Sequence, residues 1–176
     1  MTAAPRISPA FFDADGLGEL TRIAAEDAQE NDRESRFPAR TLERLHAAGV
    51  YRAIFATAPR PSTVELARIV QAVSEGDPAA GLILVNTIHA AQKLSAAEAW
   101  PERLASQLER HLAEGPLNLN SARAEPELGA PARGGLPVTL ARRTRAGWSV
   151  SGRKAYVTGS DHLDYHSVWV RTDESP

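Results

Sequence analysis

Cysteine is absent from the 176-residue chain, and its acidic and basic residues almost cancel. Without cysteine the protein cannot form disulfide bonds, use a thiolate nucleophile or build a cysteine-based metal site. The formal charge of -2 predicts no broad attraction to nucleic acid or to an anionic membrane surface. We therefore expect partners other than nucleic acids and membranes.

Long apolar runs and several enzyme motifs are also missing. The longest apolar run, GLILV, is far too short to cross a bilayer. The first residues, MTAAPRISPAFFDADG, lack both an apolar signal core and the arginine-rich character of a transit peptide, so we expect a cytoplasmic protein. The chain has no G-x-S-x-G, G-x-G-x-x-G or G-K-[ST] motif, and nothing favours a hydrolase or a nucleotide-binding loop.

Apolar periodicity and capping residues predict five helices before residue 116. Asp13 and Asp15 can cap the first helix, and the S-x-x-E spacing from Ser62 to Glu65 is typical of a capping box. Asp77 is the expected cap of the fourth helix, before a first-turn proline. The helices are expected at about 17–33, 38–49, 62–76, 79–97 and 101–112, with a loop at 51–61. Short connections between them predict an all-α bundle.

The fourth predicted helix is apolar around most of its circumference, at residues 82–85 and Ile88. We therefore expect it at the centre of the helical layer. It also carries His89, whose simplest interpretation is a histidine of the core or of a helix face. The functional alternative is a group that faces a reactant.

Composition changes after Pro116, where five strand-like segments alternate with turns rich in glycine and proline. They are LNLNSA, PVTLARR, WSVSG, KAYVTG and HSVWVRT. Together they predict the beginning of an antiparallel sheet or small barrel, so the fold class is α+β. Because the chain stops with sheet edges uncovered, we expect it to be the N-terminal part of a longer protein.

Residues 147–160, GWSVSGRKAYVTGS, are the most informative stretch. Alternating side chains predict two strand segments joined at Gly152, with Tyr156 and Thr158 on one face. An aromatic ring beside a hydroxyl suits a flat, electron-poor heterocycle. The alternative is an ordinary amphipathic strand with one solvated face.

The pattern G-W-x-x-x-G-x-K-x-Y-V-T-G, preceded by Ala124-Glu125-Pro126 and by TLARR, resembles the acyl-CoA dehydrogenase family. In that family a T/S-E-P segment and a G-x-K-x-(W/F/Y)-I-T segment of the middle β-domain both touch FAD. The likeness runs from about Phe37 to the end of the chain. It implies cofactor contacts from Ser121, Ala122, Arg123 and Ala124, and from Tyr156, Val157 and Thr158.

The resemblance also implies an architecture and a reaction. Residues 1–115 would form the N-terminal helical domain and 116–176 the start of the β-domain, with a C-terminal four-helix domain downstream. The reaction would be α,β-dehydrogenation of an acyl thioester such as acyl-CoA, with hydride transfer to flavin N5. The catalytic glutamate belongs to the C-terminal domain, so no catalytic residue is expected here. Electron-transfer flavoprotein and other copies of the chain, in a homotetramer, are the implied partners.

Two departures from the family pattern favour a different reaction on the same fold. Ala124 replaces the usual threonine or serine, and Ala130 stands where a serine often touches CoA, so Ala130 is the candidate substrate contact. The alternative is a flavin-dependent monooxygenase that uses oxygen and reduced FAD or FMN from a flavin reductase. His89 would then be its substrate-side group. A helical interaction module without enzymatic activity is the third hypothesis.

Two polar clusters have simpler interpretations. Asp161, His162, Asp164 and His166 are residue types that bind metals, but their spacing is not that of a zinc site, and a solvated turn is expected. The arginines at 142, 143 and 145 could meet a phosphate, but we expect them at the exposed end of a hairpin.

Overall fold

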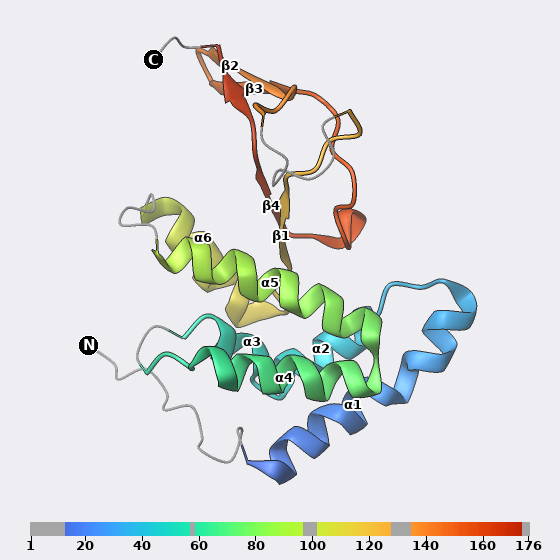
Figure 1. Ribbon diagram of the computed structural model, residues 1–176. Helices are drawn as coiled ribbons and strands as arrows, with labels where there is room; N and C mark the ends of the chain where they lie inside the picture. Colours follow the sequence, from blue (N-terminus) through green and yellow to red (C-terminus); the bar gives the residue numbers. More distant parts are fainter. Residues whose placement is uncertain (1–12, 57–58, 97–101, 128–134, 174–176) are drawn as a thin grey trace. The chain divides into compact units, whose positions relative to one another are not determined.

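The computed structural model describes residues 13–56, 59–96, 102–127 and 135–173. The chain divides into two units, Met1–Asn118 and Leu119–Pro176, and each is described by itself. In the described part, the first unit is built from α-helices, whereas the second contains short strands and a 3-10 turn (Figure 1). The predicted α+β class, with helices before a small sheet, is confirmed.

The helical unit contains the five predicted helices and one further short helix. Their bounds are α1 Ala14–Glu34, α2 Ala39–Ala47, α3 Val50–Ile54, α4 Thr63–Gly76, α5 Pro78–Ala96 and α6 Glu102–Glu114. The loop predicted from residue 51 is wrong at its start, where α3 lies. Gly49 has a φ of 89° and is the N-cap of α3, a conformation that glycine adopts without strain. Val50 and Tyr51 are fully buried, so packing supports this helix.

Side-chain caps fix where three helices begin, as the sequence predicts. The Asp13 carboxylate accepts a hydrogen bond from the Gly16 amide, 2.8 Å away. At α4 the Ser62 hydroxyl accepts from the Glu65 amide, and the Glu65 carboxylate accepts from the Ser62 amide, which completes the capping box. Asp77 accepts from the first free amides of α5. These contacts satisfy backbone donors that a helix leaves unpaired.

Close backbone approaches at two glycines bring α1, α4 and α5 together. A Cβ atom on Gly76 would collide with the Thr21 carbonyl oxygen of α1, and one on Gly81 would collide with the Ser74 hydroxyl of α4. The Thr21 hydroxyl also donates to the Ala72 carbonyl at 2.9 Å. Figure 1 shows α4 and α5 side by side. The apolar core of the unit includes Leu20, Leu42, Leu45, Ile69, Val73 and Leu84.

Helix α5 is exposed along one side, which corrects the prediction that it lies buried at the centre of the helical layer. Ile83, Leu84 and Ile88 are buried, but Leu82 is 51% exposed and His89 is also exposed. Leu82 and His89 are seven residues apart, so they lie on the same side of the helix. The helix has apolar residues outside the face that packs in the core. Its composition therefore predicts more burial than the structure shows.

The second unit contains two small sheets with mixed strand directions. Its elements are β1 Leu119–Ala122, β2 Leu140–Thr144, β3 Gly147–Ser151, the 3-10 turn η3 Ser160–His162, β4 Tyr165–Val168 and β5 Arg171–Thr172. β1 pairs with β4 in parallel, and β2 lies between β3 and β5. The predicted antiparallel pairing holds for β2 with β3, but β2 and β5 are parallel.

The strand predicted over KAYVTG is wrong, because residues 152–157 have no regular secondary structure. Tyr156 has a φ of 57°, which an extended strand does not allow. The Ala155 amide donates to the Ala124 carbonyl at 3.0 Å. The segment is thus held by a contact with a loop that is distant in sequence but adjacent in space. The alternation of apolar and polar residues cannot predict such a contact.

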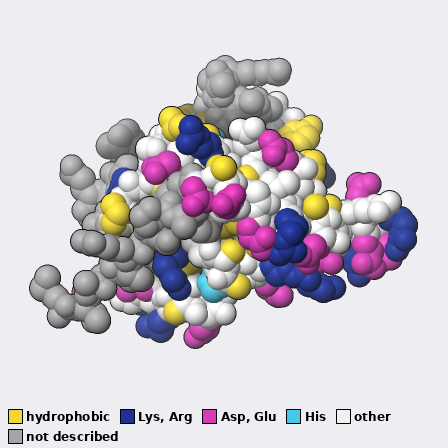
Figure 2. Space-filling model, turned by 90° about the horizontal axis from the view of Figure 1, so that it is seen from below, with side chains coloured by type: hydrophobic (Ala, Val, Ile, Leu, Met, Phe, Trp, Pro, Cys, Tyr) yellow, Lys and Arg dark blue, Asp and Glu magenta, His cyan; other side chains and the backbone are white. Residues whose placement is uncertain are grey.

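Basic and acidic side chains lie close together on the face that Figure 2 displays. On α1, Arg22 pairs with both Glu19 and Glu26, and Arg44 of α2 reaches Glu26 and Asp27. Exposed pairs of this kind contribute little to stability. Among the described helices, none combines the length and hydropathy needed to cross a membrane.

Candidate functional site

Tyr156 and Thr158 lie in the irregular segment 152–159 that follows β3, which we call the Tyr156 turn. The Tyr156 side chain is 93% exposed, while Thr158 is half-buried. The prediction that both share a face depended on an extended backbone, and the positive φ of Tyr156 removes that argument. An exposed aromatic side chain in the left-handed region needs support from its surroundings. The role of both residues in cofactor binding stays a prediction.

The other candidate cofactor segment, residues 121–124, begins at the end of β1. Ser121 and Ala122 pair with β4, and the Ala122 carbonyl accepts a hydrogen bond from the Trp169 amide at 3.1 Å. The exposed Arg123 guanidinium lies 5.4 Å from the centre of the Trp169 ring, a cation-π geometry. This segment therefore presents an arginine held by an aromatic ring.

Two hydrogen bonds bring the candidate segments 121–124 and 156–158 together. The Asn120 side-chain amide, directly before the first segment, donates to the Thr158 carbonyl at 3.1 Å. The Ala155 amide, directly before the second, donates to the Ala124 carbonyl at 3.0 Å. The two stretches that carry the family resemblance are thus adjacent in space, although more than thirty residues separate them.

Glu125, directly after the first segment, is a buried carboxylate with four hydrogen-bond donors. One oxygen accepts from the Thr139 amide at 3.0 Å, the Thr139 hydroxyl at 2.5 Å and the Lys154 ammonium at 2.7 Å. The other accepts from the Val138 amide at 2.7 Å. The Lys154 and Thr139 hydrogen bonds lower the pKa of Glu125 to about 2, against the opposing effect of burial. Glu125 is therefore an ionised, fully paired group.

Lys154 and Gly152 complete this arrangement, and both belong to the G-x-K part of the sequence pattern. The Lys154 ammonium donates a second hydrogen bond to the Trp169 carbonyl at 2.6 Å. A Cβ atom on Gly152 would lie 2.6 Å from the Thr139 Cα atom, so glycine is required for the close approach. We call Glu125, Val138, Thr139, Lys154 and Trp169 the Glu125 cluster.

Sequence reasoning missed the Glu125 cluster, although two of its members stand in the motifs that carry the resemblance. A signal was present in the sequence. Glu125 and Lys154 are opposite charges within the two stretches that carry the family resemblance, and opposite charges in neighbouring segments can pair. Because 29 residues separate them, the sequence alone does not predict that these two side chains meet.

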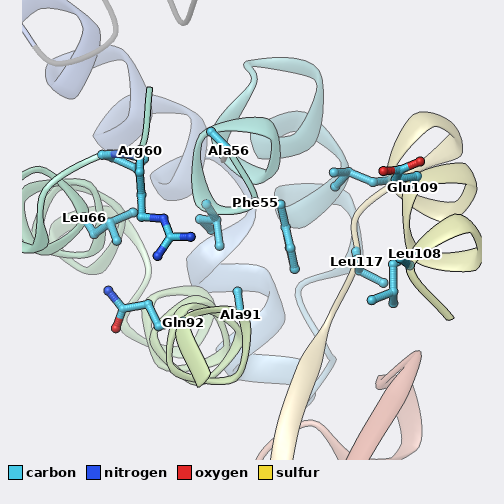
Figure 3. A pocket seen from close by; sticks show the side chains of 13 residues that line it. Phe55, Ala56, Arg60, Leu66, Ala91, Gln92, Leu108, Glu109 and Leu117 are labelled. Atoms are coloured by element: carbon cyan, nitrogen blue, oxygen red, sulfur yellow. The ribbon is translucent and has the colours of Figure 1, made fainter. Parts of the chain in front are cut away.

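The helical unit contains a largely apolar pocket of about 250 Å³, lined by residues of α3 to α6 and of the segment before α4. Figure 3 shows Arg60 and Gln92 on one side of this pocket and Leu108 and Leu117 on the other. Phe55 lies between them. The His46 ring nitrogen, 2.8 Å from the Leu112 carbonyl, ties α2 to α6 beside it. The pocket suits a small, mostly apolar group.

The remaining candidate residues lie elsewhere. His89 is exposed on α5 and does not line the pocket, and Ala130 lies outside the described residues. In the part of the chain that the structure describes, no three histidine, aspartate or glutamate side chains gather as a metal site requires. Arg142 lies 3.9 Å from Asp173, and Arg143 stacks on the Trp148 ring.

Comparison with known proteins shows what this chain is similar to in sequence and in fold. No protein-family model matches the chain. It is 27% identical over 165 residues to the candidate acyl-CoA dehydrogenase YdbM of Bacillus subtilis (strain 168), an alignment that covers 90% of this chain and 43% of YdbM. The chain thus spans less than half the length of this relative. The sequence resemblance to the acyl-CoA dehydrogenase family is confirmed.

Solved structures have the same fold at lower identity. TdsC from Paenibacillus sp. A11-2, in complex with FMN and indole, superposes with a TM-score of 0.72 and 18% identity over 92% of this chain and 40% of its own. The nitroalkane oxidase of Podospora anserina superposes with a TM-score of 0.63 and 21% identity over 98% of this chain and 45% of its own. The chain therefore has the same fold as the corresponding parts of these two proteins.

Proposed function

We propose that this chain, similar to the acyl-CoA dehydrogenases, provides flavin-binding and substrate-facing parts of an FAD-dependent oxidoreductase. The observation that carries the proposal is the adjacency of segments 121–124 and 156–158, joined by the Asn120–Thr158 and Ala124–Ala155 hydrogen bonds. These are the two stretches by which the sequence resembles the family. The proposed reaction is α,β-dehydrogenation of an acyl thioester.

The residues of the second unit fit a flavin in chemical terms. Tyr156 offers an exposed aromatic surface for one face of a ring, and Thr158 brings a hydroxyl two residues away. Arg123 of segment 121–124 adds a cation that is held on the Trp169 ring. When bound, the flavin would supply the hydride acceptor. The chain's own part would be to bind and orient the ring with segments 121–124 and 156–158.

The helical unit would contribute to substrate binding. Its pocket of about 250 Å³ has an apolar lining with the Arg60 guanidinium at one side, which suits the hydrocarbon part of an acyl group. The base that removes the α-proton must lie within hydrogen-bond reach of it. The family resemblance implies that this base is a glutamate of the C-terminal domain, so we assign no catalytic base in this chain. Electron-transfer flavoprotein and further copies of the chain are the proposed partners.

A flavin-dependent monooxygenase on the same fold is the second candidate. Two observations favour it: Ala124 stands where the dehydrogenases carry a hydroxyl residue, and the fold matches TdsC, which is solved with FMN. Such an enzyme would take reduced FMN or FAD from a flavin reductase and consume oxygen. His89, exposed on α5, would be its substrate-side group.

Anaerobic mixing of the purified full-length gene product with a series of acyl-CoA thioesters separates the two reactions. A dehydrogenase loses its visible flavin absorbance when the correct acyl-CoA is added without oxygen. A monooxygenase keeps its absorbance with every acyl-CoA and consumes oxygen when reduced flavin is supplied. A protein that neither copurifies with flavin nor binds added FAD or FMN would contradict both, and would leave the helical interaction module.

A further inference from the structure

The Glu125–Lys154 ion pair connects the ends of the two candidate cofactor segments. Glu125 directly follows Ala124, and Lys154 lies two residues before Tyr156. The pair is almost fully buried, with 2% of the Glu125 side chain and 10% of the Lys154 side chain exposed. A charge pair that is buried at a distance of 2.7 Å fixes the separation of the backbone segments that carry it, because an unpaired partner would be costly.

The pair is fastened to the rest of the second unit on both sides. Glu125 also accepts hydrogen bonds from Val138 and Thr139, directly before β2. Lys154 also donates to the carbonyl of Trp169, whose ring holds Arg123. Movement of the Lys154 ammonium would therefore disturb segment 121–124 as well as the turn that carries Tyr156.

Tyr156 is the residue that most needs this support. Its φ of 57° places a bulky residue in the left-handed region, which persists only where neighbouring contacts over-determine the backbone. Before it, Lys154 and the Ala155 amide are both held. After it, the Thr158 carbonyl accepts from Asn120. Hydrogen bonds thus hold the backbone on both sides of Tyr156, whose ring is exposed.

We propose that Glu125 and Lys154 are positioning residues, which hold the Tyr156 turn against segment 121–124 in the geometry that receives the flavin. This inference rests on the proposed function. Neither side chain needs to touch the cofactor, because each acts through the backbone next to it. Removal of the Lys154 ammonium should loosen the turn and weaken flavin binding while the helical unit stays folded.

The test compares Lys154→Met with Arg153→Met in the full-length gene product. Arg153 is the exposed neighbour of Lys154, so its substitution removes one positive charge from the same turn without touching the Glu125 cluster. FAD affinity is measured by fluorescence quenching, and the environment of the bound flavin by visible circular dichroism. We expect Lys154→Met to raise the Kd by about ten- to a hundredfold and to alter the dichroism. Arg153→Met should change the Kd less than about twofold.

Amide hydrogen exchange gives a second measurement that does not depend on bound flavin. In the flavin-free protein, Lys154→Met should speed exchange at residues 155–159, whereas exchange in α4 and α5 should not change. Glu125→Gln, which keeps the shape of the side chain and one acceptor oxygen, provides a second variant if Lys154→Met does not fold. It should shift both measurements in the same direction, because it removes the charge that pairs with Lys154.

The outcomes distinguish this inference from the proposed function. If the wild-type protein binds flavin but Lys154→Met and Glu125→Gln bind it with unchanged Kd and dichroism, the positioning role is wrong and the proposed function stands. If the wild-type protein binds no flavin at all, the proposed function fails, and the positioning role fails with it.

Discussion

The two units of this chain are stabilised in different ways. The helical unit depends on apolar packing along α1, α4 and α5, with caps at helix ends that each use residues close in sequence. The β unit has short strands, several of them exposed, and its most connected feature is the buried Glu125 cluster. A unit that depends on one polar cluster should be most sensitive to single substitutions in that cluster, whereas the helical unit should be sensitive at its buried apolar positions.

The largest expected effect is that of Glu125→Ala. It removes the acceptor of four hydrogen bonds and leaves the Lys154 ammonium buried beside the Trp169 carbonyl alone. Urea unfolding followed by tryptophan fluorescence in a Trp100→Phe background, which leaves Trp148 and Trp169, should show a larger shift of the midpoint than truncation of a buried leucine produces. An unchanged fluorescence midpoint would mean that the β unit does not depend on the cluster.

Low pH should destabilise the β unit by protonating Glu125. The folded-state pKa of Glu125 is lowered to about 2, mainly by the Lys154 hydrogen bond. A lowered pKa means that the stabilisation is fully present above the ordinary carboxylate value and is lost as the pH falls from about 4.5 towards 2. The fluorescence-detected stability should therefore fall across this window, and Glu125→Gln should flatten the fall. An equally steep fall in Glu125→Gln would assign the pH dependence to other carboxylates.

Two leucines on α5 test the helical unit. Leu84 is fully buried and Leu82 is 51% exposed, so the same substitution can be made on opposite sides of one helix. Leu84→Ala should lower the free energy of unfolding by about 2–5 kcal/mol, and Leu82→Ala should change it by less than about 0.5 kcal/mol. Far-ultraviolet circular dichroism during urea unfolding measures both. Equal losses would contradict the assigned core face.

The smallest expected effect concerns Gly152. A Cβ atom at this position would collide with Thr139 of the Glu125 cluster, so Gly152→Ala should cost about 1–3 kcal/mol. Gly115→Ala is the matched control, since a Cβ atom there meets nothing within 4 Å. Thermal unfolding of both variants is the measurement. Similar stability of the two would show that the backbone at Gly152 can move away.

The same contrast explains what could be predicted from the sequence. The Ser62–Glu65 capping box and the Asp77 cap are local signals, so α4 and α5 were predictable nearly to the residue. The exposure of Leu82 and His89 was not, because apolar composition alone does not identify the core face. In the β unit, alternation predicted β2 and β3 but also a strand through Tyr156. That turn is fixed by Ala124 and Glu125, which are distant in sequence.

Flavin titration of Tyr156→Ala beside the wild-type full-length gene product tests the central claim most directly, because Tyr156 is the exposed aromatic ring of the proposed cofactor site. Tyr165→Ala in β4 is the control for loss of an aromatic residue from the same unit. We predict that Tyr156→Ala weakens flavin binding by about tenfold or more, while Tyr165→Ala binds flavin within about threefold of the wild type. Equal flavin affinity of Tyr156→Ala and the wild type would contradict the account.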